Sequence, residues 1–329
     1  MKKQNTGVNN FRLIAAAMVV AIHCFPFQTI SKELDTLVTL TVFRIAVPFF
    51  FMVSGYYLLG PIPSSATNTY QINNYIKKQL KVYTFAIVLY LPLAFYSQSI
   101  TLDMSIISFI KQLLFNGFFY HLWFFPAWVL GLLIVQFLLK RMNIQTVLFI
   151  TFVAYLIGLG GDSWWGIVKQ VPFFFRFYNA IFQLFGYTRN GLFYAPLFFA
   201  LGAYLYKMNI KNFNSARNNY LLLLFSIEMI LESYFLHLFN IPKHDSMYLF
   251  LPFVMTLVFI KIYNWSPKNN LLNSSQLSLG VYLIHPYIIA VIHSISIYVS
   301  IFTNSIINYL SVLLISYLTI RLILKRKEW

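Results

Sequence analysis

Arg12 and His23 lie in the first hydrophobic segment of the chain, at a spacing suited to acid–base chemistry or phosphate binding. His23 is eleven positions after Arg12. In an α-helix, eleven residues turn about 20° more than three full turns, so both side chains share one face and lie about 16 Å apart along the axis. Neutral imidazole accepts a proton near pH 7, and guanidinium holds phosphate or carboxylate by paired hydrogen bonds. Because ionisable groups in a membrane usually face protein or water, the pair predicts a polar path inward from the cytoplasmic edge. A snorkelling Arg12 and a hydrogen-bonded, buried His23 are the simpler interpretations.

Two further hydrophobic segments carry a charged or titratable residue near a proline. His285 lies directly before Pro286 in the middle of its segment, which favours a functional role. Arg44 needs a partner or water within the membrane and could hold a substrate carboxylate, and we expect Pro48 to kink the same segment. Ser54 and Gly55, which follow on that segment, favour close helix packing over catalysis.

Glu228 and Glu232 are one helical turn apart in another hydrophobic segment. Glu228 should be protonated or paired with a cation at mid-membrane depth. A buried pair with Arg44 or Arg189 is the interpretation that we favour. Binding a substrate ammonium, or coupling to protons, is the alternative.

Several polar residues fall in segments that we expect on the outer side of the membrane. His121 is open to an interfacial or a site role, while Trp123 is typical of an interfacial anchor. Asp162, Arg189 and the short loop 243–246 offer further polar groups to the same rim. They could form the mouth of a substrate site, with His121, Asp162 and Arg189 among its ligands, although the sequence cannot show that they converge.

The composition places these residues in a helical membrane protein. The chain has 329 residues, of which 59% are hydrophobic and only 10% charged, and apolar runs of about 20 residues recur throughout. The net charge of +16 comes from basic residues scattered at segment ends, which is typical of membrane topology and argues against nucleic-acid binding. The lone cysteine, Cys24, excludes an intrachain disulfide. The first segment lacks a cleavage site and is expected to be a retained span.

We predict an all-α bundle of about ten transmembrane helices, forming a single domain over 1–329 with both termini cytoplasmic. The expected spans are 11–30, 36–59, 80–97, 121–140, 145–160, 190–206, 219–238, 247–263, 277–296 and 303–324. Amphipathic pieces at 104–117 and 165–185 precede the fourth and sixth spans. With the N-terminus inside, every cytoplasmic segment is basic, and removing one span would reverse every later loop.

Some chemistries lack their sequence signals. The chain has no phosphate-cradling glycine loop, no His/Cys spacing typical of a metal site and no nucleophile elbow. A nucleotide-driven pump and a zinc enzyme are therefore not expected, and we predict no metal site.

The motifs resemble acyltransferase family 3, an integral membrane family. Arg12 and His23 match its Arg-x10-His motif, and three further blocks are similar: Phe50-Phe51-Met52-Val53-Ser54-Gly55-Tyr56, His121-Leu122-Trp123-Phe124 and Tyr282-Leu283-Ile284-His285-Pro286. The resemblance implies O- or N-acyl transfer, of groups other than amino-acyl groups, from cytoplasmic acyl-CoA to an extracytoplasmic acceptor. Arg12 would then contact the phosphates of the cytoplasmic acyl-CoA donor, and His23 would activate the acceptor hydroxyl or relay the acyl group. His285 is a further candidate catalytic residue.

Nearly the whole chain also resembles the N-terminal membrane domain of VanT-type serine racemases. The similar stretches include Val19-Val20-Ala21-Ile22-His23-Cys24, the segment 155–164 and the segment 241–252. That family joins this domain to a cytoplasmic pyridoxal-phosphate racemase domain and makes D-serine for peptidoglycan precursors in vancomycin resistance, a form of antibiotic resistance. No racemase lysine can be carried over to this sequence, so we expect a freestanding membrane half with a separate racemase polypeptide as its partner.

Three functions therefore compete. In the first, the chain supplies L-serine by transport, with Arg44 holding the carboxylate and Glu228 the ammonium. In the second it is an acyltransferase that uses acyl-CoA. In the third it anchors a soluble serine racemase in the bacterial cell membrane.

Overall fold

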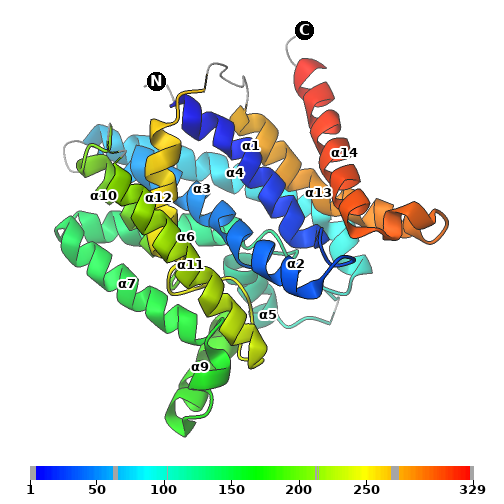
Figure 1. Ribbon diagram of the computed structural model, residues 1–329, viewed down its shortest axis with the longest axis horizontal. Coiled ribbons are helices and arrows are strands. Elements are labelled where there is room, and N and C mark those ends of the chain that lie inside the picture. The colour runs from blue at the N-terminus through cyan, green and yellow to red at the C-terminus, as the bar shows by residue number, and fades with distance from the viewer. Residues whose placement is uncertain are drawn as a thin grey trace. The chain divides into compact units, whose positions relative to one another are not determined.

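The computed structural model describes residues 5–61, 66–101, 103–211, 213, 215–267 and 274–326. These residues form helices and turns and contain no strand, so the prediction of an all-α protein is confirmed (Figure 1). Lys2, Lys3, Lys268 and Lys327, on which part of the predicted topology depends, lie outside the described residues.

The chain folds as two compact units, each assembled from separate parts of the sequence. Unit 1 comprises 1–50, 211–234 and 253–329, and unit 2 comprises 51–210 and 235–252.

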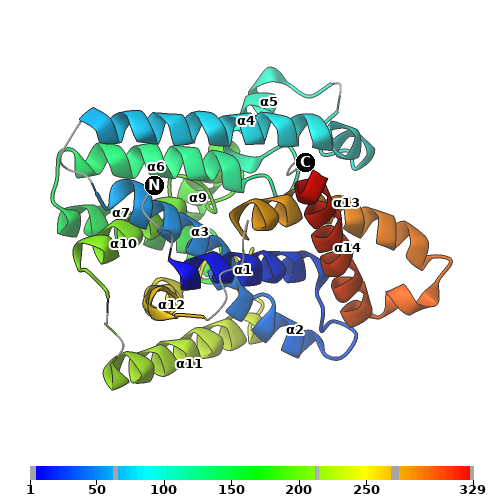
Figure 2. The ribbon, with the colours of Figure 1, turned by 90° about the horizontal axis from the view of Figure 1, so that it is seen from above.

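Unit 1 contains the first and last helices of the chain. Its elements are α1 (Thr6–Cys24), α2 (Lys32–Val38), the 3₁₀ turn η1 (Val42–Ile45), the start of α3 (Ala46–Ser54), most of α11 (Ala216–Leu238) and of α12 (Leu251–Asn264), α13 (Ser274–Ser296), the 3₁₀ turn η4 (Ser300–Thr303) and α14 (Ser305–Arg326). Figure 2 shows α1, α13 and α14 as neighbours. Their shared core contains Ala16, Val20, Val281, Ile292 and Val312.

Local chemistry sets the length of α1. Asn5 caps its N-terminus, because the side-chain oxygen accepts from the Val8 amide at 3.0 Å. The helix ends where Phe25 adopts a left-handed conformation and Pro26 follows. A side chain at Gly7 would meet the carbonyl of Ile262, so α1 and α12 approach closely there.

Unit 2 contains the middle of the chain. Its elements are the end of α3, the π-helical turn η2 (Gly55–Leu59), α4 (Ala66–Tyr96), α5 (Ile106–Lys111), the π-helical turn η3 (Gln112–Asn116), α6 (Phe124–Leu139), α7 (Ile144–Gly160), α8 (Trp165–Val168), α9 (Pro172–Phe185) and α10 (Ala195–Lys207). Side chains at Gly55 and Gly202 would meet the backbone carbonyls of Phe199 and Met52. Glycine therefore permits the close packing of α10 against α3 and η2, which confirms the packing role expected for Gly55.

Each of the ten expected spans coincides with a helical segment, and the two amphipathic pieces coincide with α5–η3 and α8–α9. Among the described residues, six helical stretches are long and apolar enough to cross a membrane: Thr6–Cys24, Lys32–Leu59, Tyr70–Tyr96, Ala216–Leu238, Ser274–Ser296 and Ser305–Arg326. The count of ten crossings and the cytoplasmic termini stay predictions.

The second expected span differs from its prediction. It is not one helix kinked at Pro48, because the break lies earlier, in the turn and 3₁₀ residues that connect α2 to α3. Pro48 is the third residue of α3, where a missing amide hydrogen removes no intrahelical bond.

Candidate functional site

His23 and His285 form the strongest candidate site in unit 1. Their imidazole rings stack with centroids 5.4 Å apart and planes inclined by 25°. His23 lies in the last turn of α1 and His285 in the middle of α13, and these two helices pack together. The fold thus brings together two of the three residues predicted to carry catalysis, from motif blocks at opposite ends of the sequence.

The hydrogen bonding of His285 sets its tautomer. Its Nδ1 lies 2.8 Å from the carbonyl oxygen of Tyr282 and 3.3 Å from that of Val281. A carbonyl only accepts, so Nδ1 carries the hydrogen and Nε2 carries the lone pair. The His285 side chain is 0% exposed, so bulk water cannot replace the carbonyl oxygens as hydrogen-bond partners of Nδ1.

Arg12 lies on the same uninterrupted helix as His23, half-buried near the N-terminal end. Ala16 and Val19 lie between these two residues on that face, and both are buried. Apolar packing therefore fills the interval, and no continuous polar stripe follows this face of α1. Any link between the two residues has to use other helices.

Arg44 lies in η1, which packs against α1 in unit 1. Its side chain is half-buried, and its Nε is buried with no hydrogen-bond partner. Glu228 is half-buried in α11, and the described part of the chain contains no ion pair between it and Arg44, one of the two partners that we favoured from the sequence. An arginine in this state is suited to binding a carboxylate or phosphate.

Asp35 is a buried acid of unit 1 that the sequence analysis missed. Its Oδ1 accepts from the Phe27 amide and the Thr39 hydroxyl, both at 2.9 Å. The signal was present in the sequence, because an acid in the first turn after Ser31, the N-cap of α2, is typical of a helix start. Its bonds indicate that it holds the α1–α2 connection in place.

A second polar cluster lies in unit 2, where three predicted outer loops converge. Asp162 Oδ1 accepts from the amides of Ser246 and Met247, at 2.8 and 2.9 Å. Arg189 Nη1 donates to the Ser246 hydroxyl at 3.2 Å. The convergence that the sequence could not show is thus present for Asp162, Arg189 and the loop 243–246.

The environment of Asp162 has opposing effects on its carboxyl. Complete burial raises the pKa of Asp162 to about 7, while the Ser246 amide, the Arg189 guanidinium and the Met247 amide act to lower it. The nearby Asp245 raises it further. Asp245 in turn lies 2.9 Å from His237 Nε2. Asp162 can therefore change charge near neutral pH.

Aromatic rings surround the remaining predicted residues of unit 2. The Arg189 guanidinium lies 4.6 Å from the Trp123 ring centroid. Trp123 is buried, so our prediction that it anchors the membrane interface is wrong; it supports Arg189 instead. His121 is also buried, and its ring contacts those of Tyr90 and Phe119.

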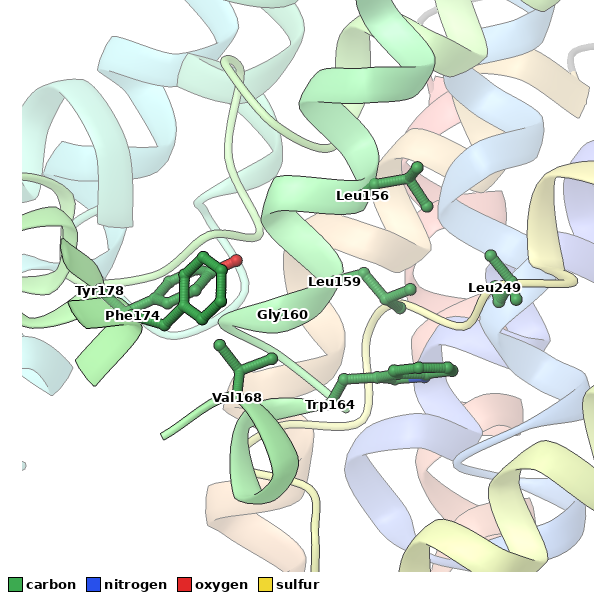
Figure 3. Close-up of a pocket in the computed structure, with 8 residues that line it drawn as sticks. All are labelled: Leu156, Leu159, Gly160, Trp164, Val168, Phe174, Tyr178 and Leu249. Carbon is green, nitrogen blue, oxygen red and sulfur yellow. The ribbon is translucent and has the colours of Figure 1, made fainter. Parts of the chain in front are cut away.

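Unit 2 also contains an open pocket of about 380 Å³ beside the end of α7 (Figure 3). Its walls come from α7, α8, α9 and nearby loop residues: Leu156, Leu159, Gly160, Trp164, Val168, Phe174, Tyr178 and Leu249. The Tyr178 hydroxyl donates to the Ile157 carbonyl at 2.7 Å. The pocket contains none of the predicted site residues, and its apolar walls do not suit a zwitterion.

The helices, with the half-buried His23 stacked on the buried His285, define a multi-pass membrane protein with titratable groups among its helices. The chain belongs to the acyltransferase 3 family, because residues 5–324 match the family's acyltransferase domain. No solved structure matches the chain significantly.

Curated relatives from enterococci cover the whole chain. The chain is 44% identical to an "Amino-acid racemase" of Enterococcus faecalis over 330 residues, which is 100% of this chain and 47% of that protein. It is 46% identical to a "Serine/alanine racemase" of Enterococcus gallinarum over 327 residues, which is 99% of this chain and 47% of that protein. The chain therefore spans about half the length of the curated relatives that it matches, and it corresponds to a VanT-like membrane domain.

Proposed function

We propose that this membrane domain supplies L-serine to a serine racemase, for D-serine-containing peptidoglycan precursors in vancomycin resistance. The observation that carries the proposal is the identity of 44–46% over the full chain to proteins named as amino-acid and serine/alanine racemases. The bacterial cell membrane is the proposed location, with the racemase on its cytoplasmic side.

The geometry of unit 1 supports binding of a small zwitterion. Arg44 has a buried Nε without a hydrogen-bond partner, and a substrate carboxylate would supply the missing acceptor. Glu228, half-buried and without an ion pair to Arg44, would hold the ammonium.

Labelled L-serine uptake into proteoliposomes containing the purified chain tests this function. We expect uptake above that of empty vesicles, and the Arg44→Gln variant should lower the rate at least tenfold, as loss of a charge-assisted hydrogen bond of about 1.5–3 kcal/mol implies. Arg141→Gln is the matched control, because Arg141 is exposed and lies over the Phe137 ring. Uptake no higher than in empty vesicles, with or without a racemase present, would remove the proposal.

The stacked histidines favour a second candidate, acyl transfer from acyl-CoA. His23 or His285 would take the proton of an acceptor hydroxyl as its oxygen attacks the thioester carbonyl. The CoA thiolate would leave and take up that proton, and Arg12 would hold the CoA phosphates. Transfer of label from acetyl-CoA in membranes, abolished by His23→Ala, supports this candidate; transfer unaffected by that change excludes it.

A further inference from the structure

Pro286 directly follows His285 inside α13. In an α-helix the amide hydrogen of each residue donates to the carbonyl four residues earlier. Pro286 has no amide hydrogen, so the Tyr282 carbonyl lacks its usual helical donor. His285 Nδ1 lies 2.8 Å from this carbonyl and takes the place of the missing donor.

The second carbonyl near His285 provides an internal comparison. Val281 is four residues before His285, so its carbonyl is the regular acceptor for the His285 amide. The imidazole Nδ1 lies farther from this occupied carbonyl, at 3.3 Å, than from the carbonyl that Pro286 leaves open. The proline thus selects the stronger of the two contacts.

We propose that Pro286 is a positioning residue, which fixes the Nδ1–H tautomer of His285 through the Tyr282 carbonyl and so makes Nε2 a proton acceptor inside the helical core. The tautomer follows from geometry alone, whereas the use of the acceptor rests on the proposed function. Its partner would be the hydroxyl or ammonium proton of an amino-acid substrate. His23 stacks on His285 with ring centroids 5.4 Å apart, so positive charges on both rings would repel each other.

Nitrogen-15 NMR of the full chain in nanodiscs, with labelled histidine, tests the proposal. The His285 signals are assigned by difference from a His285→Gln sample. We expect the wild-type proton on Nδ1 alone. In Pro286→Ala, the new amide competes for the Tyr282 carbonyl, and we expect a measurable share of the proton to move to Nε2.

Pro92→Ala is the matched control. Pro92 also lies inside a helix, α4, but follows Leu91 rather than a histidine, so this change should leave the His285 signals as in the wild type. A wild-type Nε2–H tautomer, or an unchanged tautomer in folded Pro286→Ala, would overturn the proposal.

If Pro286→Ala does not fold, the wild-type spectrum still tests the Nδ1–H tautomer on which the proposal depends, and an Nε2–H tautomer overturns it. The measurement needs no substrate, so it is separate from the uptake assay. An Nδ1–H tautomer in a chain that neither transports serine nor transfers acyl groups would remove the proposed function and leave this inference intact.

Discussion

The imidazole rings of His23 and His285 stack with their centroids 5.4 Å apart, although 261 residues lie between these two histidines in the sequence. Contact between α1 and α13 brings the rings together, and the apolar core of Ala16, Val20 and Val281 holds those helices in register. A stacked pair of this kind should act as one chemical unit, because moving either ring changes the environment of the other.

Replacing the two histidines should therefore give non-additive effects. We expect His23→Ala and His285→Ala each to lower the serine uptake rate at least tenfold. The double variant should take up serine only slightly more slowly than the less active of the two single variants. The measurement is a double-variant cycle of initial rates in proteoliposomes. His293→Ala, an exposed histidine on the same helix, should keep the wild-type rate. Losses that multiply in the double variant would show that the rings act independently.

Asp162 should stabilise unit 2 through its acceptor oxygen. In Asp162→Ala the amides of Ser246 and Met247 lose their shared partner, and each buried amide without a partner costs about 1–3 kcal/mol. Asp162→Asn keeps an acceptor oxygen in the same place and should lose much less. Thermal unfolding in detergent, followed by size-exclusion chromatography, compares the two variants. An equal loss of thermal stability in the two variants would show that Asp162 stabilises unit 2 through its charge rather than through its acceptor oxygen.

The same residue should make stability depend on pH. Burial raises the pKa of Asp162 from 3.8 to about 7, so between these values the folded chain binds the proton more strongly than the unfolded chain. This contribution to stability is complete below about pH 4 and is lost as pH rises through about 7. The unfolding midpoint of the wild type should therefore fall more between pH 5 and pH 8 than that of Asp162→Asn. Parallel midpoints in the two proteins would contradict the raised pKa.

Much of the fold follows from hydropathy, because each predicted span is a run of apolar residues that only a helix can place in a membrane. The break before α3 could not be located this way. Residues 39–45 contain no glycine or proline to mark a turn, and the turn depends on packing of η1 against α1 and on the hydrogen bond from Thr41 to Ser233, at 2.6 Å. Local propensity does not encode such distant contacts.

The sequence identified the individual residues of the candidate site, but not which of them lie in contact. Helical periodicity placed Arg12 and His23 on one face, while the pairing of His23 with His285 depends on how α1 meets α13. Trp123 illustrates the same limit. Tryptophan near a segment end is typical of an interface, and only the fold shows that Arg189 covers its ring.

Close helix packing should make Gly55 intolerant of a side chain. An added Cβ in Gly55→Ala would meet the Phe199 carbonyl, a backbone atom that cannot move alone, so we expect a loss of about 1–3 kcal/mol. Gly158→Ala is the comparison, because its Cβ would meet side-chain atoms rather than a backbone carbonyl: the end of Met247 at 2.7 Å and the Cβ of Phe193 at 2.9 Å. Thermal midpoints of both variants test the difference. A Gly55→Ala chain as stable as Gly158→Ala would contradict close packing of η2 on α10.

The ten-span topology predicts which loops face the cell exterior. Cys24 is the one cysteine in the sequence, so a Cys24→Ser background allows single cysteines to be placed at exposed positions. Ser97→Cys and Ser300→Cys should react with a membrane-impermeant maleimide on intact cells, whereas Lys140→Cys and Lys207→Cys should react only after permeabilisation. Removing any one crossing would reverse the side of every later loop, so one site labelled from the wrong side would overturn the count or the orientation. Correct labelling at all four sites would support the predicted orientation of the chain from the third span onward.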